Sequence, residues 1–274
     1  MPDPTESGRP AGDAAPARRL RVIACEIAFR EICYLAARSP SLLDLEFLSQ
    51  GHHDVPDRGR AELQSRIDAV PAGRYDAVLV GYGLCSRILP GLRASAQPLV
   101  IPRAHDCITF FLGSKERYER CFTERPGTYY YTAGWLECAQ RRGLSAGVTG
   151  GLLPTRGGDS AQAAYEHWLA RYGPEKAKYL VEAMRDWAAH YTHGVLIDLE
   201  FTRPLGLRRQ VEQICARQGW QFEVLPGDLG LLQRWLDGQW DADDFLIVPP
   251  GHQVVATHDA RIIAAEPLGE AGGS

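Results

Sequence analysis

Two short stretches carry thiol and imidazole groups at points where a strand should end. Residues 81–85, with the sequence GYGLC, follow an apolar run at 77–80, and residues 102–107, with the sequence PRAHDC, follow an apolar run at 98–101. Ligands of open α/β sheets bind at the carboxyl ends of the strands, so both stretches lie where a ligand is expected. Thiolate and imidazole together favour zinc or an iron–sulfur centre over magnesium or calcium.

The predicted ligands of this metal site are Cys25, Cys85, His105 and Cys107. His105 and Cys107 are two residues apart, a spacing that places both on one face of an extended backbone. Cys25 ends the first expected strand, and Cys85 closes another strand–loop unit. If these strands are adjacent and parallel, the four groups converge at one edge of the sheet. Three thiolates and one histidine would close a structural zinc site, whereas a missing ligand would leave a position for substrate.

Core packing is the alternative interpretation of these cysteines, because cysteine is among the most buried residue types and often fills small apolar spaces. Cys33 and Cys215 fall in expected helix interiors and are assigned to the core. Cys138 is a reserve ligand. His52 and His53 are expected to be solvated loop residues.

Further residues near the two stretches are candidates for catalysis and substrate binding. Glu26 is a candidate general base. Arg103 is placed to bind a carboxylate or phosphate or to offset thiolate charge, with a surface ion pair as the alternative. Asp106 either orients a ligand or caps the next turn, and Tyr82 between two glycines suggests close approach of backbone to a ligand. His252 follows the last expected strand and is a candidate for the same cleft.

Short apolar runs alternate with segments of helical periodicity along the chain, a pattern typical of βαβ units and a mainly parallel sheet. The predicted fold class is therefore α/β, a mainly parallel doubly wound sheet with flanking helices, formed as one continuous sheet or as two lobes. Strands are expected at 20–25, 42–48, 77–80, 98–101, 128–132, 194–199, 220–225 and 245–248, and helices at 27–37, 58–70, 114–123, 161–170, 175–190, 204–218 and 229–236.

The same pattern predicts a division of the chain into five segments. They are a disordered leader at 1–18, an N-terminal α/β lobe at 19–139 with the Cys/His cluster, a mobile loop and helical segment at 140–193, a C-terminal α/β lobe at 194–265 and a tail at 266–274. The glycine-rich stretch 143–159 is expected to be a lid.

Composition excludes several classes of function. The 274 residues are 45% hydrophobic and 23% charged, with a net charge of -4, and no basic stripe favours nucleic-acid binding. No apolar run approaches the ~18 residues of a membrane span, so no membrane partner is expected. The first 18 residues lack the apolar core of a signal peptide, which predicts a cytoplasmic protein. Seven cysteines in that compartment favour buried, catalytic or metal-bound thiols over disulfides.

Several motifs carry a resemblance to a known family. They are GYGLC at 81–85, PRAHDCIT at 102–109, LGS at 112–114, GTYYYT at 127–132 with GW at 134–135, LPGDL at 225–229 and PPG at 249–251. Over roughly residues 20–253 the chain resembles the bacterial and archaeal proteins grouped as domain of unknown function 1638. The resemblance implies no established reaction. Members of the family often resemble accessory proteins of corrinoid-dependent one-carbon metabolism, which implies a corrinoid protein as a partner.

The pair His105-x-Cys107 is also similar to the zinc motif of methylcobamide:coenzyme M methyltransferases. In that class His-x-Cys and a distant cysteine hold a zinc ion, which lowers the pKa of a substrate thiol so that the thiolate accepts a methyl group. Their distant cysteine follows the motif, whereas Cys25 and Cys85 precede it here. The likeness therefore implies the zinc chemistry without common descent.

These observations lead to three hypotheses about function. The first is a zinc-dependent, methyltransferase-like enzyme that activates a thiol or similar nucleophile of a small-molecule substrate in methyl or one-carbon transfer. The second is an iron–sulfur protein in which Cys25, Cys85 and Cys107 bind three irons and leave one open. The third is a non-catalytic protein that binds a small ligand or a corrinoid partner, with its cysteines merely buried.

Overall fold

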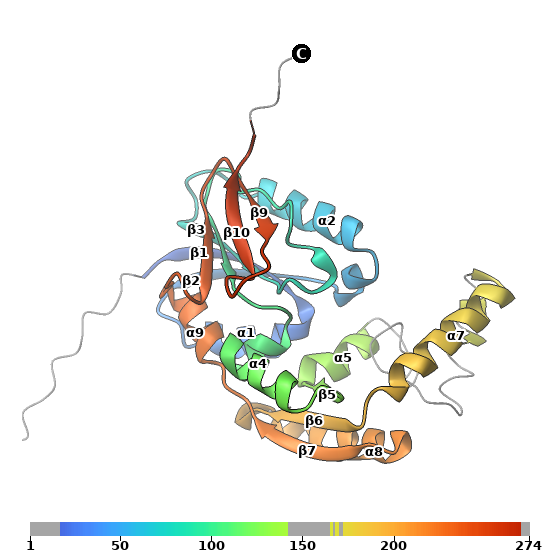
Figure 1. Cartoon of the computed structure of the whole chain (residues 1–274). Coiled ribbons are helices and arrows are strands. Elements are labelled where there is room, and N and C mark those ends of the chain that lie inside the picture. Colours follow the sequence, from blue (N-terminus) through green and yellow to red (C-terminus); the bar gives the residue numbers. More distant parts are fainter. Residues whose placement is uncertain (1–16, 142–164, 167, 170–171, 270–274) are drawn as a thin grey trace, which may run out of the picture.

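A computed structural model describes residues 17–141, 165–166, 168–169 and 172–269, and its elements are labelled in Figure 1. Its largest sheet has the strand order β2-β1-β3-β4-β8, in which the first four strands are parallel and β8 pairs antiparallel with β4. The α/β prediction is confirmed. The bounds of these strands are Arg19–Cys25 for β1, Leu42–Leu48 for β2, Ala77–Gly81 for β3, Leu99–Pro102 for β4 and Phe245–Val248 for β8.

The central strands are buried along their whole length, which explains their continuous apolar sequences. Trp235 ties a covering helix to them, because its buried indole N–H donates to the carbonyl of Val100 at 3.1 Å. Figure 1 shows α2 on one side of this sheet and α1 and α9 on the other. These helices are α1 (Phe29–Ala36), α2 (Pro56–Asp68) and α9 (Gly230–Asp237).

A second sheet is formed by three parallel strands in the order β5-β6-β7. Its side chains alternate between two cores, as strand geometry requires. Tyr130 and Val195 pack in the main core with the first sheet, whereas Tyr131 and Leu196 pack in a smaller core under α8. The elements here are β5 (Thr128–Tyr131), β6 (His193–Asp198), β7 (Gln221–Pro226) and α8 (Leu207–Gln218).

The strands do not group by the predicted boundaries 19–139 and 194–265. β5 comes from the first half of the chain but lies in the second sheet, and β8 comes from the second half but lies in the first. Helices α4 (Lys115–Glu124) and α5 (Ala133–Arg141) lie between the two sheets in Figure 1, and α7 (Pro174–Ala189) extends away from both. The predicted lid at 143–159 lies outside the described residues.

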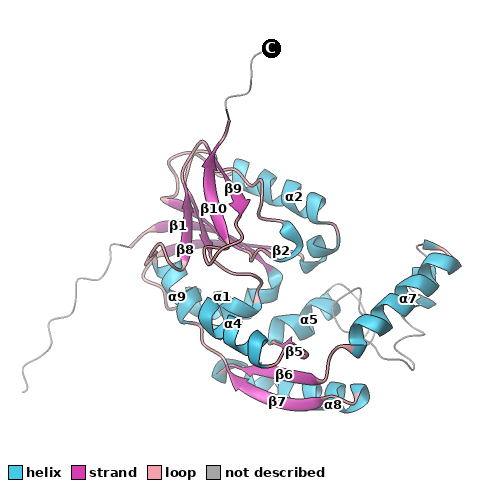
Figure 2. Cartoon of the chain, in the orientation of Figure 1, coloured by secondary structure: helices cyan, strands magenta, loops and turns pink. Residues whose placement is uncertain are grey.

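Several elements differ from the expectations in length or kind. The first helix begins with a 3-10 turn before α1, and another such turn precedes α8. Ser114 caps α4, since its Oγ accepts the N–H of Arg117 at 3.1 Å. The additional elements are η1 (Glu26–Ala28), η2 (Gln50–Asp54), η3 (Cys85–Arg87), α3 (Ile108–Leu112) and η4 (Glu200–Leu205). A further addition is the hairpin of β9 (His252–Ala256) and β10 (Ile263–Pro267), which is labelled in Figure 2.

Candidate functional site

Strands β1, β3 and β4 are neighbours and parallel, so their carboxyl ends lie along one edge of the sheet, here called the carboxyl edge. Cys25 is the last residue of β1. Cys85 opens the turn η3 that follows β3, and Cys107 is the N-cap residue of α3, which follows β4. The strands that carry these three thiols are therefore adjacent, as convergence of the thiols requires.

Glycines allow the two strand-end loops to pack directly against each other. A Cβ atom on Gly83 would lie 2.7 Å from the Cα of Asp106, which only glycine avoids. The N–H of Leu84 donates to the carbonyl of Ala104 at 2.8 Å and joins the same loops. The close approach at Gly83 is thus between two loops, and it sets Cys85 beside the backbone of Cys107, whereas Gly81 packs against Ala24 of β1 and Trp235 of α9.

The three cysteines of the carboxyl edge, Cys25, Cys85 and Cys107, are called the thiol group below. Burial raises the pKa of Cys85 to about 12, with a further increase from the charge of Asp106 and a small opposing effect of the Cys107 N–H. Burial and then the neighbouring charge of Cys85 raise the pKa of Cys107, and burial raises that of Cys25. All three are therefore protonated thiols at neutral pH, and protonated thiols are poor nucleophiles.

His53 lies next to the thiol group, although the sequence suggested a solvated loop residue. Its Nε2 is 3.8 Å from Cys25 Sγ, and its ring stacks on Tyr82 with centroids 6.1 Å apart. No motif distinguishes His53 from His52. The contact arises because β2 pairs with β1, which brings the turn after β2 beside Cys25.

Glu26 holds the turn that carries His53. Its Oε1 accepts the N–H of Gln50 at 2.8 Å and the hydroxyl of Ser49 at 3.2 Å. Both bonds join the residue after β1 to the start of η2. They give Glu26 a positioning contact with this turn, while its predicted role as a general base stays a prediction.

His105 is exposed and lies against aromatic side chains. Its ring stacks on Tyr118 with centroids 5.8 Å apart, and Tyr118 in turn stacks on Phe122 at 4.2 Å. Asp106 accepts a hydrogen bond from the Tyr118 hydroxyl at 2.8 Å and from the N–H of Ile108 at 2.9 Å. The second bond caps the first turn of α3, which is one of the two roles predicted for Asp106. Within the described part of the chain, no hydrogen bond or ring contact joins His105 to a thiol.

Arg103 and His252 make contacts away from the thiol group. The Arg103 guanidinium donates to the carbonyls of Ala242 at 2.9 Å, of Arg261 at 2.8 Å and of Ile263. His252 follows β8, which runs antiparallel to β4. The end of β8 therefore lies where the parallel strands begin, and the structure does not bring His252 to the carboxyl edge.

Cys138, the reserve ligand, lies on α5 near the end of β1. A Cβ atom on Gly134 would lie 1.7 Å from the carbonyl oxygen of Ile27, so α5 packs tightly on the turn after Cys25. The thiol of Cys138 donates to the carbonyl of Trp135 at 3.3 Å. Burial raises the pKa of Cys25, and the charge of Cys138 raises it further. The two sulfurs are therefore close enough to interact electrostatically.

As the side chains stand, no three His, Cys, Asp or Glu residues among those described are arranged to hold a metal ion. An ion at the carboxyl edge would therefore require the thiols to rotate toward one another. Metal binding commonly couples to such rearrangement of ligands, because the ligands must also lose their protons.

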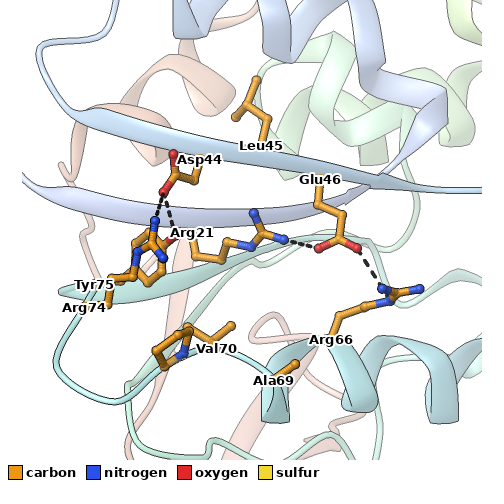
Figure 3. A pocket seen from close by; sticks show the side chains of 10 residues that line it. Arg21, Asp44, Leu45, Glu46, Arg66, Ala69, Val70, Arg74 and Tyr75 are labelled. Atoms are coloured by element: carbon orange, nitrogen blue, oxygen red, sulfur yellow. Dashed lines mark hydrogen bonds and ion pairs between the residues drawn. The ribbon is translucent and has the colours of Figure 1, made fainter.

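A separate cavity of about 450 Å³ lies beside β2, and Figure 3 shows the side chains around it. Its charged groups are already paired. Glu46 pairs with Arg21 and, at 3.5 Å, with Arg66, while Asp44 accepts the hydroxyl of Tyr75 at 2.5 Å. This cavity is called the charged pocket below.

Comparison with known proteins gives a family and no activity. The model of a family described as "Protein of unknown function (DUF1638)" matches residues 47–236. The chain belongs to this family. The matched residues include His53, Cys85, His105 and Cys107 and begin after Cys25. No curated protein and no solved structure matches the chain. Among the described residues of this DUF1638 protein, no helix is long and apolar enough to cross a membrane.

Proposed function

We propose that Cys25, Cys85 and Cys107 bind a zinc ion at the carboxyl edge, with a histidine as the fourth ligand. The zinc would activate a thiol or similar nucleophile of a small-molecule substrate in methyl or one-carbon transfer, with a corrinoid protein as the methyl donor or acceptor. The observation that carries this proposal is the thiol group itself, in which three adjacent parallel strands each deliver one cysteine to the same edge.

The protonation of these thiols favours a metal over a cysteine nucleophile. Burial keeps the pKa of each far above neutral pH, so a catalytic thiolate would need a strong local positive charge. A bound zinc ion supplies that charge and deprotonates a coordinating thiol. Thiolate ligands also exclude magnesium and calcium, which prefer oxygen.

A cytoplasmic location accords with this proposal. All seven cysteines are free thiols in the structure, as expected for a reducing compartment. Thiol ligands must stay reduced to bind zinc, so a cytoplasmic location is part of the same proposal.

Metal analysis of protein purified without oxygen tests the proposal. The wild-type chain should hold one zinc ion, and the double variant Cys85→Ser/Cys107→Ser should hold none while keeping its circular dichroism. Cys215→Ser is the matched control, because Cys215 is also a free thiol but packs with the core of the second sheet, where its Sγ donates to the carbonyl of Gly194. Absence of zinc in the wild type, or full zinc content in the double variant, would reject the proposal.

An iron–sulfur cluster is the second candidate, favoured by the number of cysteines in the thiol group. Three thiolates bind three irons of a [4Fe–4S] cluster and leave the fourth iron open. A brown anaerobic preparation with broad visible absorbance, iron and acid-labile sulfide would select this candidate over zinc. If neither metal binds, the remaining candidate is a non-catalytic protein for a small ligand or corrinoid partner.

A further inference from the structure

We infer that His53, rather than His105, completes the metal site. This inference rests on the proposed function, because it names the fourth ligand of the same site. His105 lies two residues from Cys107 in the sequence, but His53 is the imidazole that lies beside a sulfur of the thiol group.

The distance between His53 and Cys25 fits two ligands of one ion. Zinc bonds of ~2.3 Å to sulfur and ~2.0 Å to nitrogen place the two ligand atoms about 3.5 Å apart at a tetrahedral angle. Nε2 of His53 and Sγ of Cys25 are 3.8 Å apart. This N–S separation therefore matches that of two zinc ligands to within a few tenths of an ångström, while Cys85 and Cys107 would still have to rotate toward the ion.

The turn that carries His53 is held against the carboxyl edge from several sides. Glu26 bonds to Gln50 and Ser49 at its start, and Ser49 Oγ accepts the N–H of Gly51 at 3.2 Å. Gly59 of α2 packs on the same turn, since a Cβ atom there would lie 2.9 Å from the Cβ of His52. The turn also contacts η3, the element that begins with Cys85. Such supporting contacts orient metal ligands in known sites.

The surroundings of His105 favour a place outside the ligand shell. Its ring is exposed and ends a row of stacked aromatic rings with Tyr118 and Phe122. Moving it to the thiol group would break the stack on Tyr118, whose hydroxyl is fixed by Asp106. Cys25, Cys85, Cys107 and His53 would then hold the ion, and a substrate thiol would bind it only where one of these ligands gives way.

Cobalt(II) in place of zinc tests the ligand directly, because its visible bands report the atoms that bind it. The full-length wild-type chain should show the intense bands of a tetrahedral site with three sulfurs and one nitrogen. His53→Gly should shift the bands and weaken cobalt binding at least about tenfold, and added imidazole should restore both. His105→Ala and His52→Ala are the matched controls, and neither should change the bands.

The outcomes separate the two proposals. If the wild-type chain binds neither cobalt nor zinc, the proposed function fails. If the chain binds cobalt but His53→Gly leaves the bands unchanged, or His105→Ala shifts them, the metal site stands and His53 is excluded. A shift in His53→Gly that imidazole does not reverse would assign His53 to the fold and overturn the inference.

Discussion

Two regions of the first sheet, the carboxyl edge and the charged pocket, concentrate polar groups in opposite ways. At the carboxyl edge, protonated thiols are buried with neighbours that raise their pKa values. In the charged pocket, the arginines and carboxylates are partly exposed and paired, as Figure 3 shows for Glu46 with Arg21 and Arg66.

The cavity beside β2 is therefore not the better candidate site. The charged side chains of the charged pocket already pair with one another, so a charged ligand would have to displace an existing partner. The cysteines of the thiol group can bind a cation as thiolates, but only when the cation displaces their protons. In this protein, side chains that a bound ligand would stabilise identify the candidate site better than the volume of a cavity does.

Zinc affinity should depend steeply on pH, which is the largest difference expected between the two regions. Burial raises the pKa of Cys85 to about 12 and keeps Cys25 and Cys107 protonated as well, so each bound ion must release three protons. The association constant should rise by up to roughly a thousandfold per pH unit between pH 6 and 8. Chelator competition measures this slope, and calorimetry in two buffers counts the protons. A flat profile would mean that the thiols are not ligands.

Glu31 should make stability fall with rising pH. It is fully buried in α1, its two carboxyl oxygens have no hydrogen-bond partner among the residues that the structure describes, and burial raises its pKa to about 7. Below the unfolded pKa of about 4.3 both states are protonated, so there is no cost. Between the two values the unfolded state loses its proton first, so the free energy of unfolding falls by roughly 3 kcal/mol and is constant above pH 7.

The variant Glu31→Gln removes this titration. It should be about 3 kcal/mol more stable than the wild type at pH 8 and nearly equal to it at pH 4.5, measured by urea unfolding. Asp44→Asn in the charged pocket is the contrasting control. The hydrogen bond from Tyr75 lowers the pKa of Asp44, so that variant should lose rather than gain stability at pH 8. An equal effect of Glu31→Gln at both pH values would contradict the assignment.

Much of the carboxyl edge was predictable because it depends on local signals. The apolar runs before residues 81 and 102 fix where β3 and β4 end, and alternation with helices predicts parallel neighbours. The prediction for His252 was wrong because the apolar run at 245–248 does not indicate the direction of its strand. Only the pairing with β4 shows that β8 is antiparallel.

The role of tertiary contacts explains the other differences. The position of His53 depends on which strand β2 joins, which no residue near His53 encodes. The five residues of α3 (Ile108–Leu112) are too few for helical periodicity to be recognised. The grouping of β5 with β6 follows from packing between the sheets rather than from its own sequence.

Glu26→Ala should weaken metal binding without removing a ligand. The change breaks the bonds that hold Gln50 and Ser49, so the turn with His53 is less ordered. Zinc affinity should fall by about ten- to a hundredfold. The matched control is Glu46→Ala, which removes a carboxylate from the charged pocket and should leave zinc affinity unchanged. An equal loss in both variants would show a general effect of charge on the ion.

The smallest effect is expected from the ion pairs of the charged pocket. Arg21 and Glu46 are both about one-quarter exposed, with side-chain exposures of 25% and 22%, so water and salt weaken their attraction. Arg21→Gln should lower the free energy of unfolding by less than about 1 kcal/mol, and the difference should shrink in high salt. Urea unfolding at low and high salt measures it. A loss of several kcal/mol that salt does not change would mean that this pocket, like the carboxyl edge, depends on buried and poorly solvated groups, and the contrast between the two regions would not hold.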